Sequence, residues 1–225
     1  MANTLFLMLE GPLQSWGERA KWDVRDSAPE PTKSGVVGLL ACCLGLSSDD
    51  DLRCLSRQVT VAVRCDRPGT LIDDFHTISG GIMGGEGKVR PDTVVSRRQY
   101  LCDAAFLVAV HTPNAELIDG LAQALQAPHW PLYLGRKCCP PSRPPFLCTG
   151  DYPTLTASLQ SRPCEWGEGP MVNLRAVIEC EAGQGVRRRD ELLSRSRRTF
   201  GPRYTREELI TVLVRPKEDR CTSPA

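Results

Sequence analysis

The segment from Glu10 to Gly45 reads EGPLQSWGERAKWDVRDSAPEPTKSGVVGLLACCLG, and it organises the rest of the chain. An apolar strand, Thr4 to Leu9, precedes it, and a turn rich in glycine and proline leads into an apolar helix from Ser34 to Leu46. Lys33 and Ser34 put a cation and a hydroxyl at the start of this helix, where free N–H groups and the positive end of the helix dipole favour an anion. We therefore predict a strand–turn–helix corner that suits a phosphate.

Simpler roles for the same residues remain open. Thr32 or Ser34 can serve only as a helix N-cap, and Gly35 and Gly38 can serve only to let the helix pack closely against a sheet. A P-loop ATPase is disfavoured, because Lys33 is not preceded by the glycine that the motif requires, and GxGxxG is absent from the sequence. Nucleotide hydrolysis is therefore not supported.

Composition is that of a soluble globular protein. The chain has 225 residues, of which 41% are hydrophobic and 24% charged, enough for one large domain or two small ones that share a core. The longest apolar run, Val36 to Leu46, is too short to cross a bilayer, and the N-terminus lacks the basic and apolar regions of a signal peptide. We expect a cytoplasmic protein with no membrane association.

The cysteines indicate neither disulfides nor a metal site. There are 11 of them, including the adjacent pairs Cys42–Cys43 and Cys138–Cys139, but no CxxC and no two histidines at ligand spacing. Without an export signal, reduced thiols that pack as small hydrophobes are the simplest explanation. We therefore expect no metal and no cofactor.

Charge is concentrated in one segment. The formal net charge is only +1, yet residues 187–206 hold many arginines and only two acids, Asp190 and Glu191. The arginines are Arg187, Arg188, Arg189, Arg195, Arg197, Arg198, Arg203 and Arg206. Such a local excess fits either a surface that binds a polyanion or a solvated surface segment, and the sequence leaves both open.

The middle of the chain predicts strands around a glycine-rich excursion. Val59 to Cys65 and Thr70 to Thr77 read as strands, and Asp49 to Asp51 favours the start of a helix before them. Ile78 to Asp92 contains many glycines and little that could enter a core. We interpret it as a protruding hairpin rather than a phosphate cradle, because no helix follows at once to supply N–H groups.

The next part completes a mixed fold. Thr93 to His111 predicts one long strand region, and Thr112 with Pro113 predicts the start of a helix that runs from Asn114 to Gln126. The order of strands and helices favours an α+β protein: a ferredoxin-like or RRM-like domain with an inserted β-hairpin.

The remaining segment is less regular. We expect Cys148 to Gly169 to lack regular structure, Met171 to Cys180 and Glu208 to Val214 to form strands, and the tail from Arg215 to be frayed. Residues 1–150 would then form an RRM-like palm, and residues 151–225 a small β-rich region that packs on it. Near the end of the first part, the stretch 130–141 joins an aromatic ring, a glycine and two cations, which suits single-stranded RNA.

Five short blocks carry a family resemblance: GPLQSWG (11–17), PTKSGVVGLLACCLG (31–45), DFHT (74–77), RRQYLCDAAF (97–106) and PLYLGRKCCP (131–140). In this order and spacing they closely resemble the Cas-five family of CRISPR-associated RAMP proteins, and within it the subtype I-E members, which are subunits of the Cascade surveillance complex. The resemblance covers residues 3–150; beyond them only scattered positions match.

This resemblance implies an RRM-like palm with a β-hairpin thumb, placed at 78–96 here, and a small C-terminal β region. It also implies a non-catalytic subunit in antiviral defence that binds and caps the 5′ repeat-derived handle of the CRISPR RNA (crRNA). The implied partners are the handle, the adjacent backbone subunit of the Cas-seven family, the large subunit and, indirectly, target DNA.

The resemblance and the residue chemistry together give a predicted handle-binding surface. Its members are Gln14, Trp16, Lys33, Ser34, Arg97, Arg98, Tyr133, Gly135, Arg136 and Lys137. Trp16 has an open alternative as a core residue, and we expect Tyr100 and Phe106 to belong to the core rather than to stack on bases.

Two other functions compete. Relatives in subtype I-C cut precursor RNA without a metal, using a general base and a cation; here His76, beside Asp73 and Asp74, is the candidate base. A Lys–His pair like that of the cutting relatives is absent from the sequence, and we expect a structural role for His76. An RRM-like RNA binder unrelated to CRISPR should carry aromatic motifs on its central strands, whereas Val59 to Cys65 and Phe106 to Val110 are aliphatic.

Overall fold

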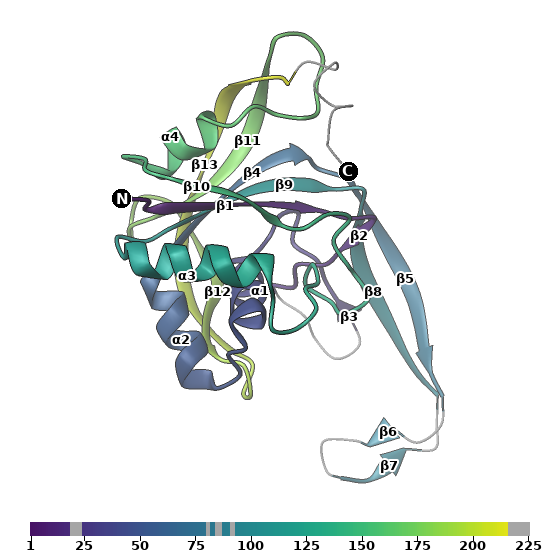
Figure 1. Ribbon diagram of the computed structural model, residues 1–225. Coiled ribbons are helices and arrows are strands. Elements are labelled where there is room, and N and C mark those ends of the chain that lie inside the picture. The colour runs from purple at the N-terminus through teal and green to yellow at the C-terminus, as the bar shows by residue number, and fades with distance from the viewer. Residues whose placement is uncertain (19–23, 80–81, 84–86, 91–92, 216–225) are drawn as a thin grey trace.

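The computed structural model describes residues 1–18, 24–79, 82–83, 87–90 and 93–215 and has an α+β architecture (Figure 1). Its main sheet has seven antiparallel strands in the order β10-β1-β9-β4-β11-β13-β12. These strands are β1 (Thr4–Glu10), β4 (Thr60–Arg67), β9 (Ala105–His111), β10 (Phe146–Gly150), β11 (Met171–Cys180), β12 (Val186–Ser194) and β13 (Thr199–Leu213). The predicted α+β class is confirmed.

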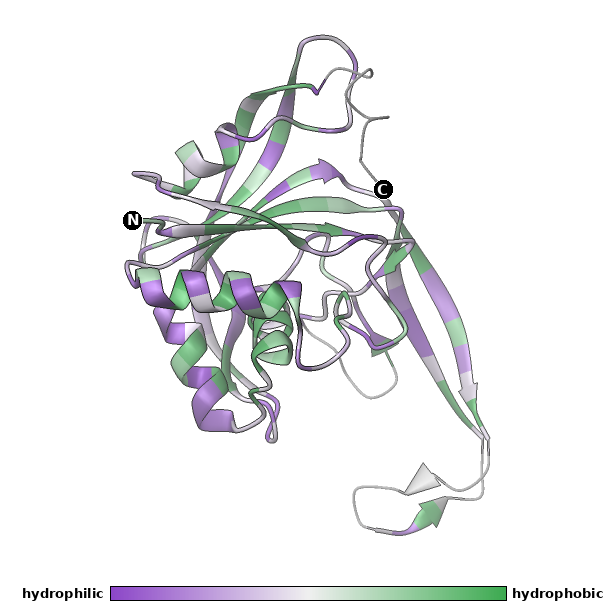
Figure 2. Ribbon diagram, viewed as in Figure 1, coloured by the Kyte–Doolittle hydropathy of each residue, from purple (hydrophilic) through white to green (hydrophobic). Residues whose placement is uncertain are grey.

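Strand β1 is buried on both faces, because helices and loops cover both sides of the sheet. Leu5, Leu7 and Leu9 join one apolar cluster, and Phe6 and Met8 join a second cluster on the opposite face. This alternation follows from the period of two along a strand. Figure 2 shows the central strands β1 and β9 as largely hydrophobic.

Three helices cover one face of the sheet, and a short helix lies on the other (Figure 1). The first three are α1 (Lys33–Leu44), α2 (Asp49–Gln58) and α3 (Ala115–Gln126), and the short one is α4 (Leu155–Gln160). Helix α4 falls within a stretch predicted to be irregular, so that prediction is wrong. Its six residues are too few to show a clear helical period in the sequence.

The ends of α1 and α3 are set by side-chain caps. Thr32 caps α1 by accepting a hydrogen bond from the Gly35 N–H, and Gly45 ends it in the left-handed region at φ 74°. Asn114 caps α3 by accepting from the Leu117 N–H, so the predicted cap at Thr112 is wrong. The Thr112 hydroxyl instead accepts from the N–H of Asn114.

A long hairpin leaves the body of the molecule (Figure 1). It consists of β5 (Thr70–Ile78) and β8 (Val94–Cys102), paired from Thr70 opposite Cys102 to Ile78 opposite Val94. Beyond them the short strands β6 (Ile82–Met83) and β7 (Val89–Arg90) pair with each other. The predicted hairpin tip, Ile78 to Asp92, lies partly outside the described residues.

Two short strands attach the base of the long hairpin to the N-terminal turn. Strand β2 (Leu13–Gln14) pairs antiparallel with β8, and β3 (Val24–Arg25) pairs parallel with it. The prediction of one continuous strand region from Thr93 to His111 is wrong. The chain turns at Asp103, which has φ 56°, so β8 belongs to the hairpin and β9 to the main sheet.

The C-terminal strands continue the same sheet. Strand β11 pairs with β4, with Val177 opposite Val63, and β13 pairs with β11 and β12. The predicted strand from Glu208 to Val214 is part of a longer strand that begins at Thr199. The division at residue 150 stays a prediction, and the tail beyond Arg215 lies outside the described residues.

Candidate nucleic-acid interface

A pocket of about 300 Å³ forms where four distant segments meet, and we call it the corner pocket. The turn at 15–17, one face of α1, the loop at 130–135 and the β12–β13 hairpin supply most of its lining, which Leu46 and Leu52 complete. Trp16, Ser34, Tyr133 and Gly135, all predicted site residues, are among the lining residues. The structure thus brings three of the sequence blocks together at one surface.

Gln14 and Trp16 support the wall of this pocket from the interior of the protein. The side-chain Nε2 of Gln14, which is 0% exposed, donates to the carbonyls of Leu9 and Ala104 at 3.1 and 2.8 Å, and its Oε1 accepts from Trp16 Nε1 at 3.0 Å. Trp16 is 1% exposed, which agrees with its alternative as a core residue. A methyl group at Gly35 would lie 2.7 Å from the indole, so Gly35 allows close packing against Trp16.

Lys33 is paired with carboxylates of the chain itself. Its side chain is 5% exposed, and Nζ lies 2.8 Å from both Glu179 Oε1 and Glu191 Oε2. Its backbone N–H donates to Asp190 Oδ2 at 2.9 Å. The anion at the start of α1 is therefore Asp190. Burial raises the pKa of Asp190, but hydrogen bonds and the charge of Arg203 outweigh it and hold this pKa below its usual value.

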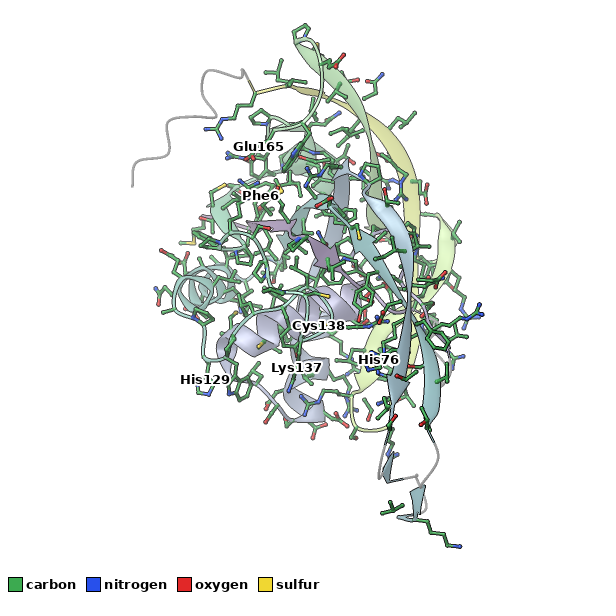
Figure 3. The ribbon with its side chains drawn as sticks, turned by 90° about the vertical axis from the view of Figure 1, so that its right-hand side faces the viewer. Phe6, His76, His129, Lys137, Cys138 and Glu165 are labelled. Carbon is green, nitrogen blue, oxygen red and sulfur yellow. The ribbon has the colours of Figure 1, made fainter. Side chains whose placement is uncertain are left out.

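The loop at 133–137 docks on the N-terminal turn through its backbone. Gly135 has φ 87°, and a Cβ there would lie 1.7 Å from the Ser15 carbonyl oxygen, so a side chain cannot be accommodated. Arg136 fixes the loop to the hairpin base, because its two Nη atoms donate to the carbonyls of Gln99 and Arg25 at 3.1 and 2.9 Å. Its guanidinium lies 4.6 Å from the ring centre of Tyr100. Lys137 is exposed (Figure 3).

Four arginines gather beside this loop. The parallel pairing of β3 with β8 sets Arg25 opposite Arg98. The pKa of Arg25 is lowered, first by burial and then by the positive charges of Arg98, Arg136 and Arg198. Mutual repulsion of this kind marks a site that favours an anion. Sequence reasoning missed Arg25 and left open whether Arg198 binds a polyanion. The pairing of β3 with β8 and that of β12 with β13, which bring these residues to the loop, cannot be seen in the sequence.

The predicted residues of the hairpin lie on its two faces. Arg98 is half-buried and shares a face with His76 and Asp74, whereas Arg97, opposite Phe75, is exposed on the other face. His76 Nδ1 lies 3.7 Å from Asp74 Oδ2, and Figure 3 shows His76 on the hairpin. As expected, Tyr100 and Phe106 are core residues, with exposures of 6% and 0%.

Within the described ranges, no cluster of three or more histidine, cysteine or acidic side chains could hold a metal ion. None of the helices there has the length and apolar character needed to span a membrane. The ten described cysteines are unpaired thiols, and Cys43, Cys65, Cys139 and Cys164 are buried. Burial raises the pKa of each of these four, so they pack as small neutral hydrophobes.

Comparison with known proteins agrees with this geometry. The model of the family described as CRISPR-associated protein (Cas_Cas5) matches residues 4–206. The chain belongs to this family. The recognition made from the five sequence blocks is therefore confirmed, and the match extends well past residue 150, where the resemblance seen in the sequence ends.

One relative in sequence and two solved structures are also similar to this chain. CRISPR system Cascade subunit CasD of Escherichia coli (strain K12) is 40% identical over 161 residues, which cover 66% of this chain and 72% of CasD. A solved structure described as a Cas protein has a TM-score of 0.71 at 39% identity, covering 92% of this chain and 94% of its own. A chain of a CRISPR RNA-guided surveillance complex has a TM-score of 0.79 at 30% identity, covering 93% and 91%.

Proposed function

We propose that this chain is a non-catalytic subunit of a type I-E Cascade complex that binds and caps the 5′ repeat-derived handle of the crRNA. Its similarity to CasD and to a chain of an RNA-guided surveillance complex supports membership in such a complex. In this assembly the adjacent backbone subunit, the large subunit and, indirectly, target DNA would be its partners.

The main observation in support of RNA binding is the position of the arginine cluster, formed by Arg25, Arg98, Arg136 and Arg198, beside the corner pocket. Phosphates would bind the guanidinium groups, and bases would enter or stack over a pocket lined by Tyr133, Trp130 and Phe200. Cations that track a backbone next to aromatic rings are the usual device for binding single-stranded nucleic acid. Arg136 contributes to both parts, because it belongs to the cluster and fixes the loop that carries Tyr133.

The predicted residues would divide into two roles. Ser34, Arg97, Arg98, Tyr133 and Lys137 would contact RNA, since their side chains are at least partly exposed. Gln14, Trp16, Lys33 and Gly135 shape the surface from behind, through burial, ion pairing or backbone contacts, and Arg136 combines this supporting role with its place in the arginine cluster.

The fold supports the same assignment in more detail. The strand order β10-β1-β9-β4, with α1 and α3 as the crossing helices, supports our proposal that this part is a ferredoxin-like or RRM-like palm. The long hairpin would be the thumb, and it extends from Thr70 to Cys102 rather than from 78 to 96. Its exposed apolar side chains, such as Phe75 at 67% exposure, suit contact with the adjacent backbone subunit.

The runner-up function is a metal-independent endoribonuclease. It is favoured by one observation, which is that His76 lies beside Asp74 on the hairpin face that also carries Arg98. A general base and a cation are the minimum that attack by the RNA 2′-hydroxyl requires. The wide exposure of His76, at 41%, argues against a site that excludes water.

Incubation of the purified chain with labelled repeat RNA from its own CRISPR array, without metal, tests the two functions. We expect the handle to bind and to stay intact on a denaturing gel. Cleavage that is lost in His76→Ala would contradict the non-catalytic assignment and support the runner-up.

Charge reversal at the loop tests the site itself. Reversal at both Arg136 and Lys137 should weaken handle binding, but Arg136 also holds the loop, so Lys137→Glu is the cleaner variant. We expect weaker binding and a salt slope smaller by at least about 0.7, the change for one phosphate contact on a single strand. The matched control is Arg57→Glu on α2, where the side chain is also exposed. Equal effects of the two variants would reject the site.

A further inference from the structure

We propose that the tip of the β12–β13 hairpin is a second RNA-binding element, which holds phosphates of the strand that enters the corner pocket. The proposal rests on the proposed function, because it extends the same RNA path. It assigns a role to the arginine-rich segment at residues 187–206, for which the sequence alone allows either a polyanion-binding site or a solvated surface segment.

A second hollow, of about 540 Å³, lies between the N-terminal turn and this tip, and we call it the tip groove. Arg189, Arg195 and Arg198 line it together with Gly17, Glu18, Leu192, Thr199 and Phe200. Leu192, Arg195 and Phe200 also line the corner pocket. The two hollows are therefore adjacent, so that a strand with a base in the corner pocket would run past the arginines of the groove.

Some arginines of the arginine-rich segment are neutralised by carboxylates, and two of those that line the groove are not, within the part of the chain that the structure describes. Arg188, Arg203 and Arg206 pair with carboxylates of the chain: Glu30, Asp190 and Glu208 respectively. Arg189 and Arg195 are exposed and form no salt bridge with any residue that the structure describes.

Arg198 links the groove to the first site. Its positive charge contributes to the lowered pKa of Arg25, so it lies close enough to act on the arginine cluster beside the 133–137 loop. One carboxylate, that of Glu18, lines the groove against three guanidinium groups. The cationic surface thus continues from the base of the long hairpin to the tip of β12–β13.

The tip is held in place by a residue of another element. Asp49, the first residue of α2, accepts hydrogen bonds from the Arg195 and Ser196 N–H groups at 2.9 and 3.2 Å and from the Ser194 hydroxyl at 2.6 Å. Arg189 Nε donates to the Phe200 carbonyl at 3.4 Å. The backbone of the tip is therefore already ordered before binding, which lowers the entropic cost of binding RNA there and favours a site over a merely solvated segment.

The features of the groove favour RNA over a protein partner. Its guanidinium groups stand around a concavity rather than a flat apolar patch, and the concavity opens beside a pocket lined by aromatic rings. Guanidinium groups bind phosphate through two parallel hydrogen bonds. The chemistry that the groove would recognise is the phosphodiester backbone of a single strand.

The test compares the full-length chain with Arg189→Ala/Arg195→Ala, using labelled handle RNA over a range of salt concentrations. The matched control, Arg53→Ala/Arg57→Ala on α2, removes the same charge away from the groove. We expect the groove variant to lower the salt slope by about 0.7 for each lost phosphate contact, and the control to leave it unchanged.

A second measurement locates the phosphates that the groove holds, and its titrations of the natural chain do not depend on how the variant folds. Handle RNAs with one neutral methylphosphonate linkage at each position in turn are titrated against the natural chain and the groove variant. We expect one or two linkages at which neutralisation weakens binding to the natural chain but not to the variant.

The outcomes separate the two proposals. If the natural chain binds no handle RNA, the proposed function and this inference fail together. If it binds and the groove variant behaves like the control, the inference alone is overturned. A variant that binds more weakly while every linkage stays equally sensitive would also overturn the inference, because the arginines would then act only through the overall electrostatic field of the protein. Normal RNA binding by a variant that fails to assemble into the complex would overturn it too, because the groove would then bind a protein partner.

Discussion

Two glycines of α1 with similar sequence surroundings have different roles. A Cβ at Gly35 would lie 2.7 Å from the Trp16 ring, whereas a Cβ at Gly38 would meet nothing within 4 Å, because Gly38 faces the corner pocket. The alternative that both glycines only allow the helix to pack closely therefore fits Gly35, whose close neighbour is Trp16 rather than the sheet, and does not fit Gly38. Gly38 leaves the pocket open.

This difference gives a prediction at the residue scale. Gly38→Ala should raise the free energy of unfolding by about 0.5–1 kcal/mol, because alanine favours a helix, while its methyl group narrows the pocket and weakens handle binding. The measurement is urea unfolding together with RNA titration. Gly120→Ala in α3, where a Cβ also meets nothing within 4 Å, is the control for stabilisation without loss of binding. Gly35→Ala should instead destabilise the fold by about 1–3 kcal/mol, since the indole is in the way.

Sequence reasoning identified the residues near the site better than their roles. It selected Trp16, Lys33 and Arg136, and all three lie at or behind the candidate surface. It could not foresee that Glu179 and Glu191, far along the chain, neutralise Lys33. A cation near a helix start looks the same in a sequence whether it awaits a phosphate or already has a carboxylate.

At the scale of elements, Asp49 joins the start of α2 to the tip of the β12–β13 hairpin. Hydrogen bonds from the Ser194 and Ser196 side chains, then from backbone N–H groups, lower the pKa of Asp49 well below its usual value. A carboxyl whose folded-state pKa is depressed stabilises the fold above its unfolded pKa, about 3.9, and loses this contribution as the pH falls through the folded-state value. The tip should therefore stay anchored at neutral pH.

We predict that Asp49→Asn loosens the tip at neutral pH, and that acid loosens it in the natural chain only well below pH 4. Hydrogen exchange at the amides of Arg195 and Ser196 measures this directly, because both donate to Asp49. The salt slope of RNA binding should fall in the same variant. Asp50→Asn, one residue away and paired with Arg53 on the surface, should change neither quantity.

Strands and helices with strong patterns were predictable from the sequence, but two kinds of element were not. Alternating or β-branched segments such as β1, β4 and β11 were recognised, because burial imposes a period that the sequence shows. The separation of β8 from β9 was missed, since one turn at Asp103 carries no glycine or proline signal. The pairing of β12 with β13 was also missed, because arginines dominate the segment.

At the scale of the whole molecule, a buried ion pair on β4 ties the segment after residue 150 to the middle of the main sheet. Arg64 of β4 is 0% exposed and forms two hydrogen bonds with Asp66, at 2.6 and 2.7 Å. Its Nη1 donates to the Leu159 carbonyl at 2.6 Å, at the end of α4. The main sheet also continues without interruption across residue 150, so the two parts share one apolar interior.

We therefore predict a single unfolding transition for the whole chain. Arg64→Met should lower the free energy of unfolding by about 3–5 kcal/mol, because it leaves the Asp66 carboxylate buried without its partner. Tryptophan fluorescence and far-ultraviolet circular dichroism in urea should give coincident curves. Two separate transitions, with only one shifted by the substitution, would contradict this coupling.

Photo-crosslinking of handle RNA to the full-length chain tests the central claim most directly. RNA with 4-thiouridine at successive positions is bound and irradiated, and the crosslinked peptides are identified by mass spectrometry. We predict crosslinks in the loop at 130–137 and at the β12–β13 tip, where Tyr133 and Phe200 line the corner pocket. Crosslinks confined to α4 and the opposite face of the main sheet would contradict the account.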